Sequence, residues 1–222
     1  VVSYLVAESV VYRNAQRSTN LIIDQVRRDL EELFSDSIEL AQTLAVNPII
    51  QAAIEPRFAG QETRSRLDEG VGNELFEIAG YREEPANAYV VSDDGRVYSP
   101  QQVDADGDTI RRSYWYRRIL YASFLPVTFP PHGGSHINQS DDARLISFGY
   151  PIVNSESNAR LGVVLVEVEE QRVKDMLTAR LGATGYLFVQ YGRSGFTSSH
   201  DKAPDSDYLV SLANNEEIDP AI

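Results

Sequence analysis

The feature that most restricts the fold is a long stretch from Glu8 to Ala53 that has no glycine and a single proline, Pro48. Apolar side chains recur three or four residues apart along it, which is the spacing of one face of an α-helix. These positions are Ile22, Val26, Leu30, Leu33, Leu40 and Leu44, with Ser37 in the same stripe. The spacing predicts a helix of about ten turns that ends or kinks at Asn47-Pro48. Globular helices typically have roughly 8 to 20 residues, so this length indicates a dimer contact or a rod that joins a domain to a membrane.

Shorter elements are predicted after the long helix. Ile49–Ala79 favours one or two helices, interrupted near Pro56 and Gly60. The composition then changes to β-branched and aromatic residues. Tyr89–Val91 and Arg96–Tyr98 flank a turn rich in aspartate and glycine, which predicts a β-hairpin and the beginning of a sheet.

The middle of the chain combines helical, loop and strand patterns. Ser113–Ala122 is a helical or irregular aromatic segment, and Leu125–Gln139, which is rich in proline, glycine and histidine, predicts a loop. Arg144–Val153 and Leu161–Val168 are rich in strand-forming residues and are predicted to pair as an antiparallel hairpin. A helix is expected over Glu170–Leu181, because an apolar face there is followed by a glycine.

A second hairpin that resembles the first is predicted from Gly185–Gln190 and Phe196–Ser199, which indicates an internal repeat. The remaining residues, Asp201–Ile222, are polar and are too few for the strands of a second complete module. The fold class predicted from these patterns is α+β, with a long N-terminal helix and antiparallel sheets.

Composition excludes several functions. The net charge is −13, with 33 acidic and 20 basic residues, so the field of the protein repels nucleic-acid backbones. We expect no nucleic-acid binding. The absence of cysteine excludes thiol nucleophiles and cysteine-bound metals, but it leaves the compartment open.

The sequence gives no support for catalysis or for a metal centre. His132 and His136 have the spacing of a helical zinc pair, but tandem glycines between them predict an exposed loop. Asp104–Asp108 resembles the beginning of a calcium loop, but its glycine comes too early, and we interpret it as a turn. No nucleophile elbow, Walker loop or dinucleotide fingerprint is present. We expect no catalytic residue, no metal and no cofactor; a hydrolase would need a nucleophile beside His132, His136 or His200.

The chain begins with a short apolar run, Val1–Val6, which is interrupted by Glu8 and Arg13. This run is too short to span a bilayer. It is either the outer end of a transmembrane helix or the first turn of a soluble one, and the sequence favours neither.

The order of these elements resembles that of the double Cache sensor domains. The features that carry the resemblance are the long helix, the hairpin around Asp93–Gly95, the Trp115-Tyr116 pair, the strand with Gly149–Ile152 and the strand Leu161–Val168. The resemblance covers about residues 20–199 and depends on order and spacing. It implies an α+β fold in which one long helix packs beside two PAS-like modules outside the cytoplasmic membrane. The implied domains are residues 1–80 for the helices, 81–182 for a membrane-distal module and 183–222 for the beginning of an incomplete membrane-proximal module.

The resemblance also implies where a ligand binds. In the amino-acid-binding branch of the family, an Arg-x-Trp-Tyr element and a later strand aspartate contact the ligand carboxylate and ammonium. Here Ser113 stands at the arginine position, after Arg111 and Arg112, and Glu167 stands at the aspartate position. Strand parity places Glu167 on the face of Val163 and Leu165. The implied ligand-binding residues are Arg112, Tyr114, Trp115, Tyr116, Tyr150 and Glu167. The alternatives are core packing for the aromatic residues and an exposed strand end for Glu167.

The function implied is a ligand-binding sensor of a membrane-anchored signal transducer, most simply a histidine kinase. The expected ligand is a small polar molecule such as an amino acid, amine, carboxylate or sugar. A lid formed by residues 114–136 would close on it, and the long helix, which could also form a homodimer, would carry the change. The alternatives are the sensor of a chemoreceptor or of a cyclic-dinucleotide enzyme, and a structural or dimerisation module that binds no ligand.

Overall fold

The computed structural model describes residues 2–55, 61–80, 87–100, 103, 105–137, 143–181, 188–191 and 195–198. The chain divides into two compact units. One comprises Ser35–Glu170, and the other comprises Val1–Phe34 together with Gln171–Ile222. Each unit is described by itself. The boundaries 1–80, 81–182 and 183–222 from the sequence remain a prediction.

The long N-terminal helix is confirmed as α1, Val2–Val46. Its stripe is buried from Val26 to Leu44, and Ile22 is half-buried. The helix ends where the periodicity predicts, because Asn47 caps the next helix, α2 (Pro48–Ile54), by accepting hydrogen bonds from the backbone N–H groups of Ile49 and Ile50. The helix α3 (Gln61–Leu75) and a π-helical turn, η1 (Phe76–Gly80), complete this helical part.

The unit Ser35–Glu170 contains a five-stranded antiparallel sheet in the order β2-β1-β5-β4-β3. Its strands are β1 (Asn87–Ser92), β2 (Val97–Tyr98), β3 (Val127–Gly133), β4 (Arg144–Val153) and β5 (Arg160–Glu169). Both predicted hairpins of this region are confirmed. The predicted loop Leu125–Gln139 is wrong over β3, which pairs with β4 at the sheet edge.

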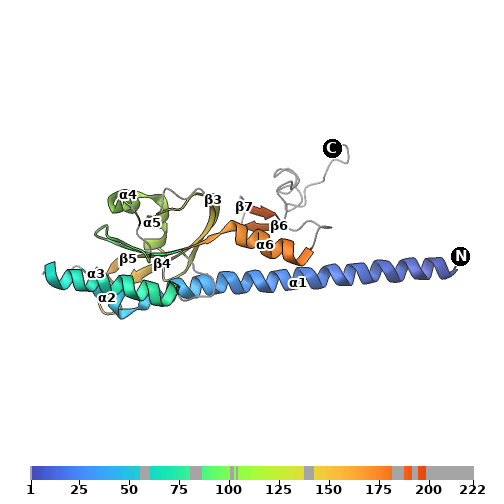
Figure 1. Ribbon diagram of the computed structural model, residues 1–222, viewed down its shortest axis with the longest axis horizontal. Helices are drawn as coiled ribbons and strands as arrows, with labels where there is room; N and C mark the ends of the chain where they lie inside the picture. The colour runs from blue at the N-terminus through green and yellow to red at the C-terminus, as the bar shows by residue number, and fades with distance from the viewer. Residues whose placement is uncertain are drawn as a thin grey trace. The chain divides into compact units, whose positions relative to one another are not determined.

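Helices cover both faces of this sheet (Figure 1). The short helices α4 (Gly107–Arg112) and α5 (Tyr114–Leu120) lie on one face, and α2 and α3 lie on the other. Gly149 lets α5 approach the sheet closely, since a Cβ atom there would lie 2.2 Å from Cδ1 of Ile119. The core between α5 and the sheet includes Trp115, Tyr116 and Leu165, all buried. Odd-numbered residues of β5 therefore face α5.

The second unit contains the first part of α1, the helix α6 (Glu170–Leu181) and a two-stranded sheet, β6 (Phe188–Tyr191) with β7 (Gly195–Ser198). Val173 and Leu177, on the apolar face of α6, are buried as the pattern predicts, and so is Glu170 at the beginning of the helix. An ion pair of 2.8 Å joins Arg180 of α6 to Asp29 of α1. The predicted tail Asp201–Ile222 lies outside the described residues. No helix in the described part of the chain has an 18-residue window apolar enough to cross a membrane.

Candidate ligand-binding site

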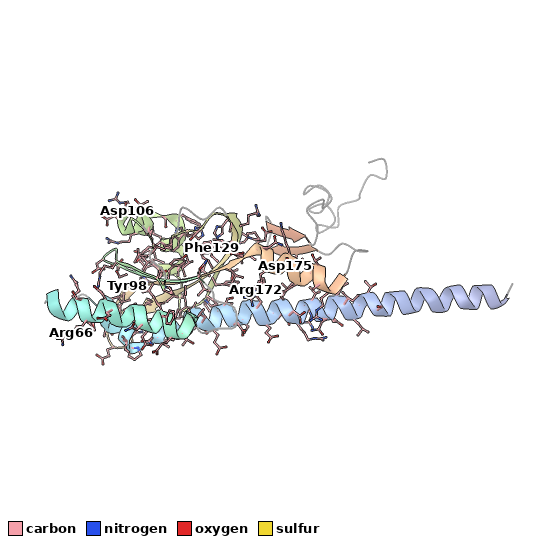
Figure 2. The ribbon with its side chains drawn as sticks, viewed as in Figure 1. Arg66, Tyr98, Asp106, Phe129, Arg172 and Asp175 are labelled. Atoms are coloured by element: carbon pink, nitrogen blue, oxygen red, sulfur yellow. The ribbon has the colours of Figure 1, made fainter. Side chains whose placement is uncertain are left out.

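Two hydrogen-bonding side chains position α4 and α5. Asp106, marked in Figure 2, caps α4 by accepting from the backbone N–H of Asp108 at 3.1 Å. Ser113 ends α4 and begins α5, because its hydroxyl donates to the carbonyl of Ile110 at 2.6 Å and accepts from the N–H of Tyr116 at 3.3 Å. A serine is suited to this N-cap position and an arginine is not. The residue that departs from the Arg-x-Trp-Tyr element therefore has a structural role here.

The turn between β1 and β2 holds the beginning of α4. A Cβ atom at Gly107 would lie 1.6 Å from the carbonyl oxygen of Gly95, so only a glycine permits this contact. The close approach brings Asp93, in the same turn, alongside the arginines of α4.

A cleft of about 350 Å³ opens between this turn and the two helices. Its charged lining has three guanidinium groups and two carboxylates: Arg111, Arg112, Arg117, Asp93 and Asp108. Its remaining lining residues are Tyr116, Leu120 and Tyr121. A second cleft of about 490 Å³ adjoins the first, since both are lined by Asp93 and Arg111. The pair is large enough to bury a small polar ligand.

Two polar groups of the first cleft are left unsatisfied. The hydroxyl of Tyr116, whose side chain is 1% exposed, and Nε of Arg111 are both buried without a hydrogen-bond partner in the described part of the chain. Burial, and secondarily the charge of Asp93, raises the pKa of Tyr116, so its phenol stays neutral and able to donate. An unsatisfied buried group of this kind costs about 1–3 kcal/mol, which a ligand can recover.

Glu167 lies on the sheet face toward α5 and does not line the cleft. It is 1% exposed and accepts hydrogen bonds from the hydroxyl of Ser135 at 2.5 Å and the backbone N–H of His136 at 2.9 Å. The hydroxyl of Ser147, opposite Glu167 on β4, lies 3.4 Å from its Oε1. The same hydroxyl lies 2.7 Å from Nε2 of His132. This carboxylate is therefore surrounded by donors from the chain itself.

Three stacked rings continue this cluster. The imidazole of His136 lies between the indole of Trp115, 5.1 Å away, and the imidazole of His132, 4.1 Å away. Phe129 of β3, marked in Figure 2, meets the His136 ring edge-on at 5.5 Å. Burial lowers the pKa of His132 and, with the charge of His132, lowers the pKa of His136 to about 4. Both rings are therefore neutral at pH 7. The prediction of an exposed histidine loop is wrong, because β3 and the stack partly bury both side chains.

The structure divides the six residues implied by the sequence. Trp115 and Glu167 belong to the cluster on the sheet face, which also contains His132, Ser135, His136 and Ser147. Arg112 and Tyr116 line the cleft instead. Tyr114 is 76% exposed. The Tyr150 hydroxyl donates to the carbonyl of Phe124 at 2.9 Å. The ligand-binding roles of these six residues remain predictions.

Sequence reasoning placed Glu167 on the correct face but missed several functional candidates: Asp93, Arg117, Ser135, His136 and Ser147. Strand parity could have identified Ser147, and nothing local indicated Ser135.

Within the described residues, no group of three or more histidine, aspartate or glutamate side chains is placed to hold a metal ion.

Comparison with known proteins relates this fold to solved structures. No family model and no curated protein matches the sequence. Solved structures do match. The ligand-binding domain of the Campylobacter jejuni chemoreceptor Tlp3, in complex with L-valine, has a TM-score of 0.63 at 15% identity and covers 96% of this chain and 78% of its own. The chain shares the fold of this domain, which is the Cache-type fold.

Two further structures share this fold. The sensor domain of the Vibrio cholerae histidine kinase DctB has a TM-score of 0.62 at 12% identity, and covers 94% of this chain and 80% of its own. The ligand-binding domain of the Pseudomonas fluorescens chemoreceptor CtaA, in complex with L-serine, has a TM-score of 0.54 at 17% identity, and covers 86% of this chain and 74% of its own. The predicted α+β fold, with a long N-terminal helix and an antiparallel sheet, is confirmed.

Proposed function

We propose that this chain is the extracytoplasmic ligand-binding domain of a membrane-anchored signal transducer, and that it is not an enzyme. The Cache-type fold supports the proposal, because the structures that share it are named as sensor or ligand-binding domains of chemoreceptors and of a histidine kinase. Domains of this fold occur both in a chemoreceptor and in a histidine kinase. A histidine kinase remains the output that we expect.

The ligand binds in the cleft lined by Arg111, Arg112, Arg117 and Tyr116. The observation that carries this assignment is the buried, unpartnered hydroxyl of Tyr116 in a cleft with three guanidinium groups. A carboxylate would accept from the phenol and from a guanidinium fork, which are charge-assisted bonds of the strong kind. The preferred ligand is therefore a small molecule with at least one carboxylate.

The experiment is a thermal-shift screen of carboxylates, amino acids, amines and sugars, followed by calorimetry on those that bind. A ligand at about 100 times its Kd should stabilise the fold by about 2.7 kcal/mol. Arg112→Ala should weaken binding about tenfold or more. Arg118→Ala is the matched control, because this exposed arginine of α5 faces the Phe129 ring and does not line the cleft. If no compound shifts the melting temperature, or if both variants bind equally well, the assignment is wrong.

We also propose that the domain dimerises through α1. Leu21 of α1 is an exposed apolar side chain, at 62%, and α1 has 45 residues, a length that favours a helix–helix contact. Light scattering coupled to gel filtration would measure the mass over a range of concentrations. Leu21→Glu should shift a dimer to a monomer, whereas a mass unchanged at one protomer in the parent chain would contradict the proposal.

A further inference from the structure

The two clefts beside α4 are connected at two places. Asp93 and Arg111 line both of them and form a junction between the two spaces. In addition, the guanidinium of Arg160, which lines the second cleft, lies 4.7 Å from the ring centroid of Tyr121, which lines the first. A ligand whose carboxylate is held in the first cleft therefore has room to extend past the junction into the second.

The junction offers one hydrogen-bond donor and one acceptor that the chain leaves unused. Nε of Arg111 is buried without a partner among the described residues, since the ion pair of this guanidinium with Asp108 uses Nη1. The carboxylate of Asp93 takes part in no hydrogen bond or ion pair within the described part of the chain. A free donor and a free acceptor thus line the same place.

The turn that carries Asp93 is held by its neighbours. Both carboxylate oxygens of Asp94 lie within 3.0 Å of Nε of Arg96. Nη1 of Arg96 donates to the carbonyl of Ala53 at 3.1 Å, and the backbone N–H of Asp93 donates to the carbonyl of Leu161 at 2.7 Å. These bonds tie the turn to α2 and to the first part of β5, whereas the side chain of Asp93 stays available.

The lining of the second cleft is polar and of mixed charge. It includes the carboxylates of Glu55, Asp93 and Asp94 and the guanidinium groups of Arg111 and Arg160. An ammonium group there meets two guanidinium groups, and a carboxylate meets three carboxylates, so neither charge is clearly favoured. A hydroxyl group suits this lining better, because it can donate to a carboxylate and accept from a guanidinium at the same time.

We propose that the two clefts together bind a polyhydroxy carboxylic acid, with its carboxylate in the first cleft and its hydroxylated body in the second. A hydroxyl group at the junction donates to Asp93 and accepts from Nε of Arg111. The inference rests on the proposed function and names its ligand class. Uronic acids are the simplest probes of this class.

Matched ligands separate the contributions of the carboxylate and of the hydroxyl groups. Calorimetry on the whole chain at pH 7 would compare glucuronate and galacturonate with cyclohexanecarboxylate, which keeps a ring and the carboxylate but has no hydroxyl group. Glucose, which has no carboxylate, is the second comparison. We expect at least one uronate to bind about tenfold or more tightly than either of these compounds.

The other outcomes distinguish this inference from the proposed function. Equal or tighter binding of cyclohexanecarboxylate overturns the inference but leaves the proposed function in place. Equal binding of glucose overturns the inference and the preference for a carboxylate. If neither uronate binds but another carboxylate of the thermal-shift screen does, only the inference is wrong. If no compound of the screen binds, the proposed function fails as well.

Asp93→Ala tests the acceptor at the junction. It should weaken binding of the better uronate about fivefold to tenfold, because an acceptor for its hydroxyl groups is lost. It should leave the affinity for cyclohexanecarboxylate unchanged or slightly tighter, since a negative charge beside the cleft is removed. Glu156→Ala is the matched control, because Glu156 is exposed and lines neither cleft. If Asp93→Ala changes both affinities by the same factor, the hydroxyl groups do not use the junction and the inference is wrong.

A large side chain at position 159 tests whether the ligand reaches the second cleft. Ala159 is exposed and lines only this cleft, so Ala159→Trp should obstruct it without disturbing the core and should weaken uronate binding about tenfold. Ser155→Trp is the control, since this exposed serine belongs to the same connection between β4 and β5 and lines neither cleft. Circular dichroism and the melting temperature would check that both variants are folded. A folded Ala159→Trp variant that keeps the parent affinity would show that the ligand does not extend into the second cleft.

Discussion

Trp115 and Tyr116 are adjacent in α5 and their rings meet edge-on at 6.0 Å, yet the polar groups beside one ring differ from those beside the other. Around Trp115, the carboxylate of Glu167 accepts from Ser135 and His136 and the rings are stacked, and the one buried polar atom left without a partner among the described residues is Nε2 of His136. Around Tyr116, a buried hydroxyl has no partner among the described residues. The first region contributes to stability, and the second retains unused capacity for a ligand. Substitutions should therefore affect stability in one region and affinity in the other.

The largest effect is expected at Glu167. Glu167→Ala removes a buried acceptor, leaves its two partly buried donors unsatisfied and opens a cavity, so the free energy of unfolding should fall by about 3–5 kcal/mol. Urea denaturation followed by circular dichroism would measure it. The control is Glu169→Ala, because Glu169 is an exposed residue of the same strand and its loss should change stability by less than about 0.5 kcal/mol. Similar losses in both variants would contradict the division between the two regions.

The next largest expected effect is a dependence of the free energy of unfolding on pH. The pKa of His136 is lowered to about 4, from an ordinary value of about 6.5. The folded state therefore favours the neutral ring: this contribution is fully present above pH 6.5 and is lost as the pH falls toward 4. The expected loss is about 2 kcal/mol after allowance for the partial exposure of the ring.

A phenylalanine substitution isolates this contribution. His136→Phe keeps a flat ring between Trp115 and His132 but does not titrate. Urea denaturation at pH 7 and pH 4 should give a smaller fall in stability for the variant than for the parent chain. Parallel pH profiles would show that protonation of His136 is not coupled to unfolding. The cleft contributes no group to this effect, so ligand affinity measured at pH 7 should not change in the variant.

Sequence periodicity predicts most of the fold, because the residues that face the core recur at the regular spacing of a helix or of a strand. The stripe of α1 from Val26 to Leu44 has the helical period and is buried. The parity of β5 places Glu167 with Val163 and Leu165 on one face, as observed. In both cases a local spacing determines which side chains face the core.

The parts that sequence reasoning missed depend on tertiary context. Pro130 and Pro131 suggested a loop, but β3 is an edge strand, where prolines are tolerated, and its register shifts between Phe129 and His132. Ser135 and His136 meet Glu167 across about 30 residues of sequence, and no local pattern encodes that contact. For the same reason Trp115 and Tyr116 appeared to line one pocket, whereas only Tyr116 lines the cleft, although the two rings meet edge-on at 6.0 Å.

The smallest effect is expected at Tyr116, and its sign distinguishes the two regions most sharply. Tyr116→Phe removes a buried hydroxyl that has no partner among the described residues, so the ligand-free protein should be unchanged or more stable by about 1 kcal/mol. The same change should weaken carboxylate binding by about 1 kcal/mol, or roughly fivefold, because a donor to the ligand is lost. Urea denaturation and calorimetry on the same samples would measure both quantities. The matched control is Tyr150→Phe, since the Tyr150 hydroxyl already donates to the carbonyl of Phe124 and the residue does not line the cleft. This control should leave affinity unchanged, whereas a Tyr116→Phe variant that loses stability and keeps its affinity would place Tyr116 with Glu167 among the residues that only organise the fold.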